Sequence, residues 1–285
     1  MKKQIIVCTI VLLAAVALSQ AQEPTITGKV DLTYTSKYVW RGFNVFGTQS
    51  AIHPTVNLFM PSTSMGFSVE GHRANSSGYE IIERWDYSLY YLGRMFVGED
   101  YEMNYRLAYV YYNYPQQSSS SRGSNPMEDP GFCLDDGSFE IHEGHVVMSF
   151  PKILPIEGLV PTYCLVKLAP VNSGTIVGAN SPSGGTASGF AHIFMFDYAM
   201  PFTCPFTGVD RDLNLHSEFV FNDGVSPVGT NADHDWSNAV FGASTSYEIE
   251  ENVNLTPGIF YQSSWDDSVN SSDEYWVSLG ASYDF

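Results

Sequence analysis

About twelve segments of roughly ten residues alternate apolar and polar side chains along this chain, and Gly, Pro, Asn, Ser or Asp bounds each of them. No helical pattern lies between them. The predicted strands cover residues 26–41, 50–60, 64–73, 83–93, 101–113, 139–150, 159–169, 189–200, 212–222, 237–248, 252–262 and 274–285. This repetition predicts one all-β domain of antiparallel strands.

The last predicted strand shows the alternation most clearly. From Tyr275 to Phe285 the odd positions are large and apolar or aromatic except for Ala281, whereas most even positions are small or polar. An aromatic last residue with Tyr283 two positions before it resembles the sorting signal of bacterial outer-membrane barrels. The barrel-assembly machinery is therefore an expected partner.

The N-terminus predicts export. Lys2 and Lys3 precede the apolar stretch 5–18, and the small-residue sequence Ser19-Gln20-Ala21 ends it, as in a secretory signal peptide. Residues 1–21 are the predicted signal peptide and residues 22–285 the predicted barrel domain. No later segment approaches the roughly 20 consecutive apolar residues of a membrane helix. A mature protein in a membrane would therefore have to be a closed barrel.

The links between the predicted strands support a membrane barrel. Links after even-numbered strands are mostly short, such as 61–63, and links after odd-numbered strands are mostly long and polar, such as 114–138. Short periplasmic turns and long extracellular loops are typical of outer-membrane barrels. The chain holds 18 Tyr, 18 Phe and 5 Trp at a mean hydropathy of −0.09, which suits aromatic girdles around a polar lumen. An exported carbohydrate-binding β-sandwich is the soluble alternative.

One segment also resembles a known family. Residues 36–42, SKYVWRG, match the S-x-Y-x-x-R-G segment of the TorF-type porins, a family of bacterial outer-membrane β-barrel proteins. The likeness continues through Pro54, Gly66-Phe67 and the strand 83–91, and so covers roughly residues 30–92. The resemblance implies a barrel and a pore, without a known solute.

Alternation also predicts which side chains line the lumen. Continuing the first strand through residue 41 sends Tyr38 and Trp40 outwards, towards the lipid headgroups. The same parity predicts ten lumen carboxylates and six lumen cations. The carboxylates are Asp31, Glu70, Asp86, Glu102, Glu143, Asp197, Glu218, Glu248, Glu274 and Asp284; the cations are Lys29, Lys37, Arg41, Arg84, Arg106 and Lys167. An excess of fixed negative charge predicts mild cation selectivity. The alternative is that Lys37 and Arg41 pair with carboxylates and brace the wall.

No catalytic group emerges from the sequence. His216 and Ser217 are the nearest approach to a His/Ser pair, but adjacent strand residues point to opposite faces and cannot act as base and nucleophile. Among Glu140, His142, Glu143 and His145, at most two side chains share a face, too few for a defined metal centre. We predict no enzyme activity, no metal site and no cofactor.

Three cysteines remain after removal of the signal peptide: Cys133, Cys164 and Cys204. Cys164 and Cys204 lie towards the same predicted rim, and an oxidising periplasm permits a bond between them. Unpaired thiols are the alternative.

The net charge bears on partners. The formal charge is −18, and loss of Lys2 and Lys3 makes it −20. Such acidity argues against nucleic acid as a partner. Lipid, lipopolysaccharide and small polar solutes are the expected partners. The sequence thus predicts a passive pore in the bacterial outer membrane, with a non-conducting, loop-displaying barrel as the alternative.

Overall fold

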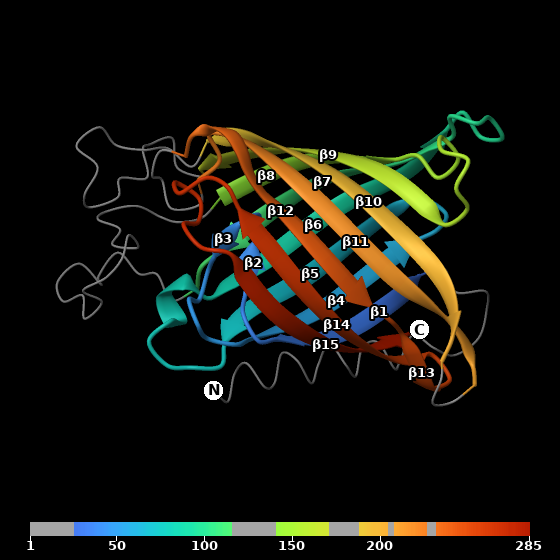
Figure 1. Cartoon of the computed structure of the whole chain (residues 1–285), viewed down its shortest axis with the longest axis horizontal. Coiled ribbons are helices and arrows are strands. Elements are labelled where there is room, and N and C mark those ends of the chain that lie inside the picture. The colour runs from blue at the N-terminus through green and yellow to red at the C-terminus, as the bar shows by residue number, and fades with distance from the viewer. Residues whose placement is uncertain (1–25, 116–140, 171–187, 205–207, 227–231) are drawn as a thin grey trace.

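The computed structural model describes residues 26–115, 141–170, 188–204, 208–226 and 232–285. Twelve antiparallel strands form a closed barrel (Figure 1). They are β1 (Thr27–Thr35), β4 (Ala51–Met60), β5 (Met65–Ala74), β6 (Arg84–Met95), β7 (Met103–Asn113), β8 (Ile141–Ser149), β9 (Leu159–Pro170), β10 (Gly189–Thr203), β11 (Asp210–Asp223), β12 (His234–Ser244), β14 (Val253–Ser264) and β15 (Glu274–Asp284). The predicted fold class is confirmed.

The barrel closes between the first and last strands. β1 pairs with β4 on one side and with β15 on the other, and β12 pairs with β14. No barrel strand is therefore left with a free edge, which removes the unpaired backbone groups that lipid cannot satisfy.

Short elements complete the described chain. β2 (Val39–Trp40) and β3 (Phe43–Asn44) form a separate hairpin, β13 (Tyr247–Glu250) extends the sheet beside β14, and Glu80–Ile82 form a single 3-10 turn. No helix among the described residues is long and apolar enough to cross a membrane.

The outer surface of the barrel is apolar. On β1, for example, Leu32 and Tyr34 are 52% and 42% exposed, while Thr33 between them faces the lumen. The same alternation gives outward-facing side chains on other strands, among them Phe67, Leu89, Leu107, Tyr109, Phe194, Phe196, Phe241, Ile259, Val277 and Leu279. So wide a band of exposed apolar side chains is stable only against lipid.

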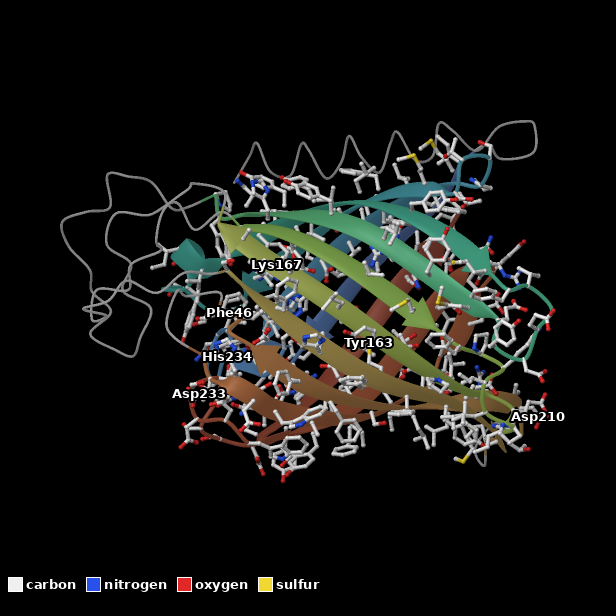
Figure 2. All side chains as sticks on the ribbon, turned by 90° about the horizontal axis from the view of Figure 1, so that it is seen from above. Phe46, Tyr163, Lys167, Asp210, Asp233 and His234 are labelled. Atoms are coloured by element: carbon white, nitrogen blue, oxygen red, sulfur yellow. The ribbon has the colours of Figure 1, made fainter. Side chains whose placement is uncertain are left out.

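The two ends of the barrel differ. At the turn end, compact links such as 61–64 and 96–102 join neighbouring strands, and β1 begins beside the end of β15. At the loop end, longer segments such as 36–50 and 265–273 connect the strands. Phe46 lies at the loop end and Asp210 at the turn end (Figure 2).

The first strand is shorter than predicted. β1 ends at Thr35, and the chain then turns into the barrel. The prediction that Tyr38 and Trp40 point outwards is wrong: Tyr38 is only 7% exposed and stacks on His72, a lumen side chain of β5. Trp40 packs edge-on against Tyr112 of β7, across the lumen.

Candidate functional site: a hairpin inside the lumen

Residues 36–50 leave β1 and fold into the loop end of the lumen, and we call this segment the lumen loop. Its hairpin pairs Val39 with Asn44 and Trp40 with Phe43. Two residues, Arg41 and Gly42, form the tip. Both have positive φ, of 49° and 93°, as a tight two-residue hairpin turn requires.

Glycine is required at the tip for space as well as for conformation. A Cβ atom on Gly42 would lie 2.6 Å from Oδ1 of Asn238 and 2.8 Å from a methyl group of Val269. The backbone carbonyl of Gly42 accepts hydrogen bonds from Gln262 Nε2 at 2.9 Å and from Asn270 Nδ2 at 3.2 Å. The tip is therefore fixed against β12, β14 and the loop that follows β14.

Arg41 carries the strongest link between the hairpin and the opposite wall. Its guanidinium forms a two-pronged ion pair with Glu143 of β8, whose side chain is 1% exposed. The same carboxylate accepts hydrogen bonds from the hydroxyl of Tyr112 and from the ring of His145. A buried carboxylate with this many donors remains ionised and holds the cation in one position.

Lys37 makes a second ion pair, with Glu274 at the start of β15. Glu274 also accepts hydrogen bonds from Asn44 at 2.8 Å and Asn270 at 3.2 Å. Lys37 and Arg41 thus both pair with carboxylates of the wall, which is the bracing alternative raised by the sequence.

Aromatic rings fill the space beneath the hairpin. Tyr38 stacks on His72 with ring centres 4.8 Å apart and also packs against Phe46. Trp40 lies under two guanidinium groups, those of Arg41 at 4.6 Å and Arg84 at 5.0 Å. These cation–π contacts stabilise the two charges in a partly dehydrated site.

An apolar cluster covers the neighbouring wall at the same level. It consists of buried side chains from β7 to β11, namely Val110, Tyr112, Ile141, Cys164, Val166, Leu168, Ala191, Ile193 and Val220, with Val225 from the following loop. Trp40 packs against this cluster. The lumen loop and the cluster together constrict the loop end of the lumen.

The remaining lumen wall is polar. Lys29 of β1 lies opposite Asp284 of β15, and Asp31, Glu70 and Glu218 lie on the lumen faces of their strands. Other predicted charges on this wall are Arg106 of β7, Arg84 and Asp86 of β6, Asp197 of β10 and, by its pairing with Asn254, Glu248 of β13. Arg84 and Asp86 form an ion pair at 2.7 Å.

Two of the predicted pore-lining residues lie elsewhere. Lys167 is on the outer face of β9, over the ring of Phe190 at 4.3 Å, because Val166 and Leu168 are the lumen side chains there. Glu102 lies in the turn before β7. Its carboxylate accepts hydrogen bonds from Lys152 at 2.7 Å and from the Gly98 amide at 3.0 Å, and it pairs with Arg94.

The structure places the histidines and cysteines that the sequence singled out. His216 bonds to Asp197 in the lumen and Ser217 lies on the opposite face of β11, so these two side chains do not pair. Cys164 and Cys204 are both buried and do not form a disulfide with each other. Cys133 and Glu140 lie outside the described residues.

The sequence missed one cluster, formed by His53, Glu70 and His72. No sequence spacing within one strand reveals it, because the residues come from two strands. The register of the β4–β5 hairpin would have revealed it. Met60 pairs with Met65, so residues whose numbers add to 125 lie opposite one another, and 53 and 72 are such a pair.

Comparison with known proteins places the fold. No family model and no curated protein sequence matches the chain. The NanC porin has a similar structure, with a TM-score of 0.51 at 10% identity over 89% of this chain and 98% of the porin. An outer membrane channel from Pseudomonas putida F1 gives 0.50 at 9% identity over 93% of this chain and 97% of the channel. The chain therefore has a transmembrane barrel fold of the type found in bacterial outer membranes.

Proposed function

We propose that the protein is a passive outer-membrane channel for small polar solutes, narrowed by its own lumen loop. One observation carries the proposal: a polar, charged lumen wall surrounds a hairpin held in place by the Arg41–Glu143 and Lys37–Glu274 ion pairs. A polar, charged interior inside an apolar exterior is typical of water-filled porin channels. The proposed function requires no enzyme activity.

The mature channel would span residues 22–285, after removal of residues 1–21. Its turn end would face the periplasm and its loop end the outside, with lipid and lipopolysaccharide around the wall. The resemblance to the TorF-type porins supports this assignment, since Ser36, Tyr38, Arg41 and Gly42 of the shared segment all hold or shape the lumen loop. Ser36, for instance, is bonded to the backbone of Val277 on β15.

The lumen charges favour cations. Within the predicted set, five lumen carboxylates have no ion-pair partner in the described part of the chain: Asp31, Glu70, Glu218, Glu248 and Asp284. Of the predicted lumen cations, only Lys29 and Arg106 likewise lack an ion-pair partner in that part of the chain. This excess attracts mobile cations into a narrow aqueous path.

A non-conducting barrel is the second candidate, and the packing at the loop end favours it. Tyr38, Trp40 and Phe46 fill space that a solute would need. Such a barrel would serve adhesion or envelope structure through its loops.

Single-channel recording of refolded protein in planar bilayers distinguishes the two. A channel gives steps from the wild-type protein, with a small conductance set by the constriction. A variant with residues 37–45 replaced by a short Gly/Ser linker should give larger steps. Absence of steps from the wild type, with steps from the linker variant, would identify a plugged barrel. Absence of steps from both folded proteins would reject the channel.

A further inference from the structure

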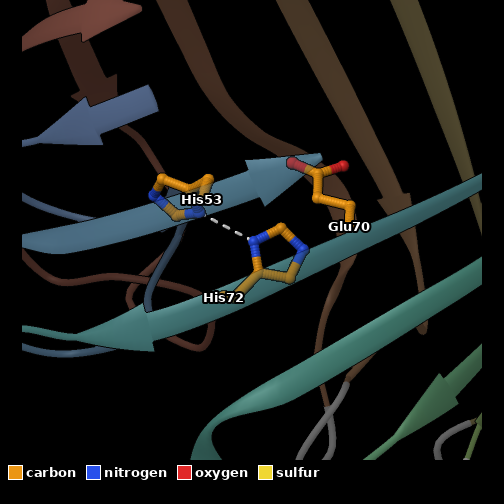
Figure 3. Close-up of side chains that lie close together, drawn as sticks. All are labelled: His53, Glu70 and His72. Carbon is orange, nitrogen blue, oxygen red and sulfur yellow. Dashed lines mark hydrogen bonds between the residues drawn. The ribbon is translucent and has the colours of Figure 1, made fainter. Parts of the chain in front are cut away.

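Three potential metal ligands meet on the lumen wall directly beneath the lumen loop. His53 of β4 and Glu70 and His72 of β5 place their ligand atoms within 4.8 Å of one another (Figure 3). Both histidines are 6% exposed. They face one another across the β4–β5 hairpin, and Glu70 lies two residues along β5 on the same face of the sheet.

The histidines belong to a hydrogen-bonded chain. His53 Nε2 lies 2.9 Å from the Thr35 hydroxyl, the two Nδ1 atoms lie 2.9 Å apart, and His72 Nε2 lies 3.0 Å from Asp86. A carboxylate only accepts, so His72 Nε2 carries a proton. With neutral rings, His72 Nδ1 is then the acceptor and His53 Nδ1 the donor. The Nδ1 atom of each imidazole thus faces the other ring. The Nε2 atom of each is hydrogen-bonded to the wall, in His53 to Thr35 and in His72 to Asp86.

Glu70 is the member of this cluster without a partner. Its carboxylate makes no hydrogen bond or ion pair within the described part of the chain. Asp86, by contrast, is occupied by Arg84 and His72. A half-buried carboxylate whose oxygen lies within 4.8 Å of two imidazole nitrogens, with no hydrogen bond of its own in this part of the chain, has an unused capacity to bind a cation.

We propose that His53, Glu70 and His72 bind a divalent transition-metal ion of the zinc type. Two imidazoles and one carboxylate are a common zinc set, with a fourth position left for water. Zinc–nitrogen distances of about 2.0–2.1 Å in a tetrahedron place ligand atoms about 3.3 Å apart. The two Nδ1 atoms need to separate by a few tenths of an ångström from their present 2.9 Å, both rings turn so that their Nδ1 lone pairs point at the ion, and the Glu70 side chain rotates inwards. The proton on His53 Nδ1 moves to Nε2, where it is donated to Thr35.

The surroundings support this set over the other histidines. The Asp86 carboxylate orients the ring of His72 and the Thr35 hydroxyl orients the ring of His53, as groups outside the ligand set do in zinc sites. Tyr38 stacks on His72 and restricts its rotation. His145, His216 and His234 each pair with a single carboxylate, and no second three-ligand group is found among the described residues.

Zinc binding can be measured without reference to conduction, so the proposal does not depend on the channel assignment. Refolded, tag-free mature barrel is titrated with ZnCl2 by calorimetry. We expect one ion per barrel. His53→Asn and His72→Asn should weaken binding by more than about 100-fold, and Thr35→Val by about 10-fold, as loss of an outer partner does. His216→Gln, on another wall of the lumen, is the matched control and should leave the affinity unchanged.

X-ray absorption of the zinc-loaded protein supplies a second readout, and two imidazole ligands are expected. Heat-modifiable gel mobility establishes that each variant is folded; if a histidine variant fails to fold, Glu70→Gln and Thr35→Val carry the test. Absence of binding would overturn the proposal. So would equal affinity of the folded Glu70→Gln and wild-type proteins, or a zinc environment without imidazole.

Discussion

Arg41 donates two hydrogen bonds to Glu143, at 2.7 and 2.8 Å, and these bonds join the tip of the lumen loop to β8 on the opposite wall. The pair is buried, so its geometry fixes where the hairpin lies. Breaking this ion pair is therefore the most direct way to test what sets the width of the pore.

Changing Arg41 to Gln should release the hairpin. Removing one partner of a buried ion pair typically costs about 3–5 kcal/mol, because the other charge is left buried and unpaired. We expect a conductance several times that of the wild type, measured in planar bilayers. Arg73→Gln is the control, since its pair with Glu83 is at the surface and its side chain is 61% exposed. Equal conductance of the two folded variants would contradict a constriction held by Arg41.

Reversing the charge at both Lys37 and Arg41 should change selectivity. Replacement of each by Glu removes two positive charges and adds two negative ones, a change of four charge units at one level of the lumen, and breaks both ion pairs. The reversal potential in a salt gradient should move towards the cation limit, and the shift should shrink at high salt because mobile ions screen fixed charge. A double variant that inserts normally and keeps wild-type selectivity would show that neither residue borders the ion path.

Acid should weaken the turn end of the barrel through Glu102. Hydrogen bonds from Lys152, the Gly98 amide and Arg94 lower the pKa of Glu102 from 4.5 to about 2. Because the pKa is lower in the folded state, the ionised Glu102 carboxylate contributes to the free energy of unfolding. This contribution is present in full above pH 4.5 and is lost as the pH falls towards 2. Urea unfolding should therefore separate the wild type from Glu102→Gln at pH 7, and the gap should close between pH 4.5 and 2. A gap of constant size across that range would contradict the assignment.

Loss of Phe285 should impair membrane assembly. Its ring packs over Gly28, stacks beside Tyr283, and its backbone exchanges two hydrogen bonds with Gly28 at 2.7 and 2.9 Å. Phe285→Asp or deletion of the residue should leave the protein in the periplasm, where it is degraded. Fractionation and immunoblotting measure this, with Phe285→Tyr as the control. Wild-type levels of Phe285→Asp in the outer membrane would exclude a role in sorting.

The two ends of the barrel should be accessible from opposite sides. An epitope inserted near Ser119, which lies outside the described residues, should be labelled on intact cells. One inserted at Thr63, in the turn between β4 and β5, should be labelled only after the outer membrane is permeabilised. The reverse pattern would invert the proposed orientation.

The sequence predicted the strands well because each needs only a local alternation. It failed at Tyr38 and Trp40 because the period of two continues through residue 41, although the strand ends at Thr35. What turns the chain inwards is a set of distant partners: His72, Tyr112, Glu143 and Glu274. No local pattern contains that information.

Lys167 was misplaced for a different reason. β9 carries apolar side chains on both faces, with Cys164, Val166 and Leu168 inside and Leu165 outside. Alternation assigns a face only where one side is polar, so a strand beside the apolar lumen cluster gives no indication of its orientation. The apolar cluster that narrows the lumen is therefore the reason why alternation along β9 does not show which of its faces points inwards.

The partners of the lumen loop also set an order of events during folding. Lys37 and Glu274 are 237 residues apart in the chain, and Gly42 and Gln262 are 220 apart. Contacts between such distant residues form late, because the intervening chain must first be ordered. A sheet that still lacks β15 also lacks Glu274, and so cannot hold Lys37. Barrel closure therefore completes the constriction, because a sheet that lacks β15 would hold its hairpin without the Lys37–Glu274 ion pair.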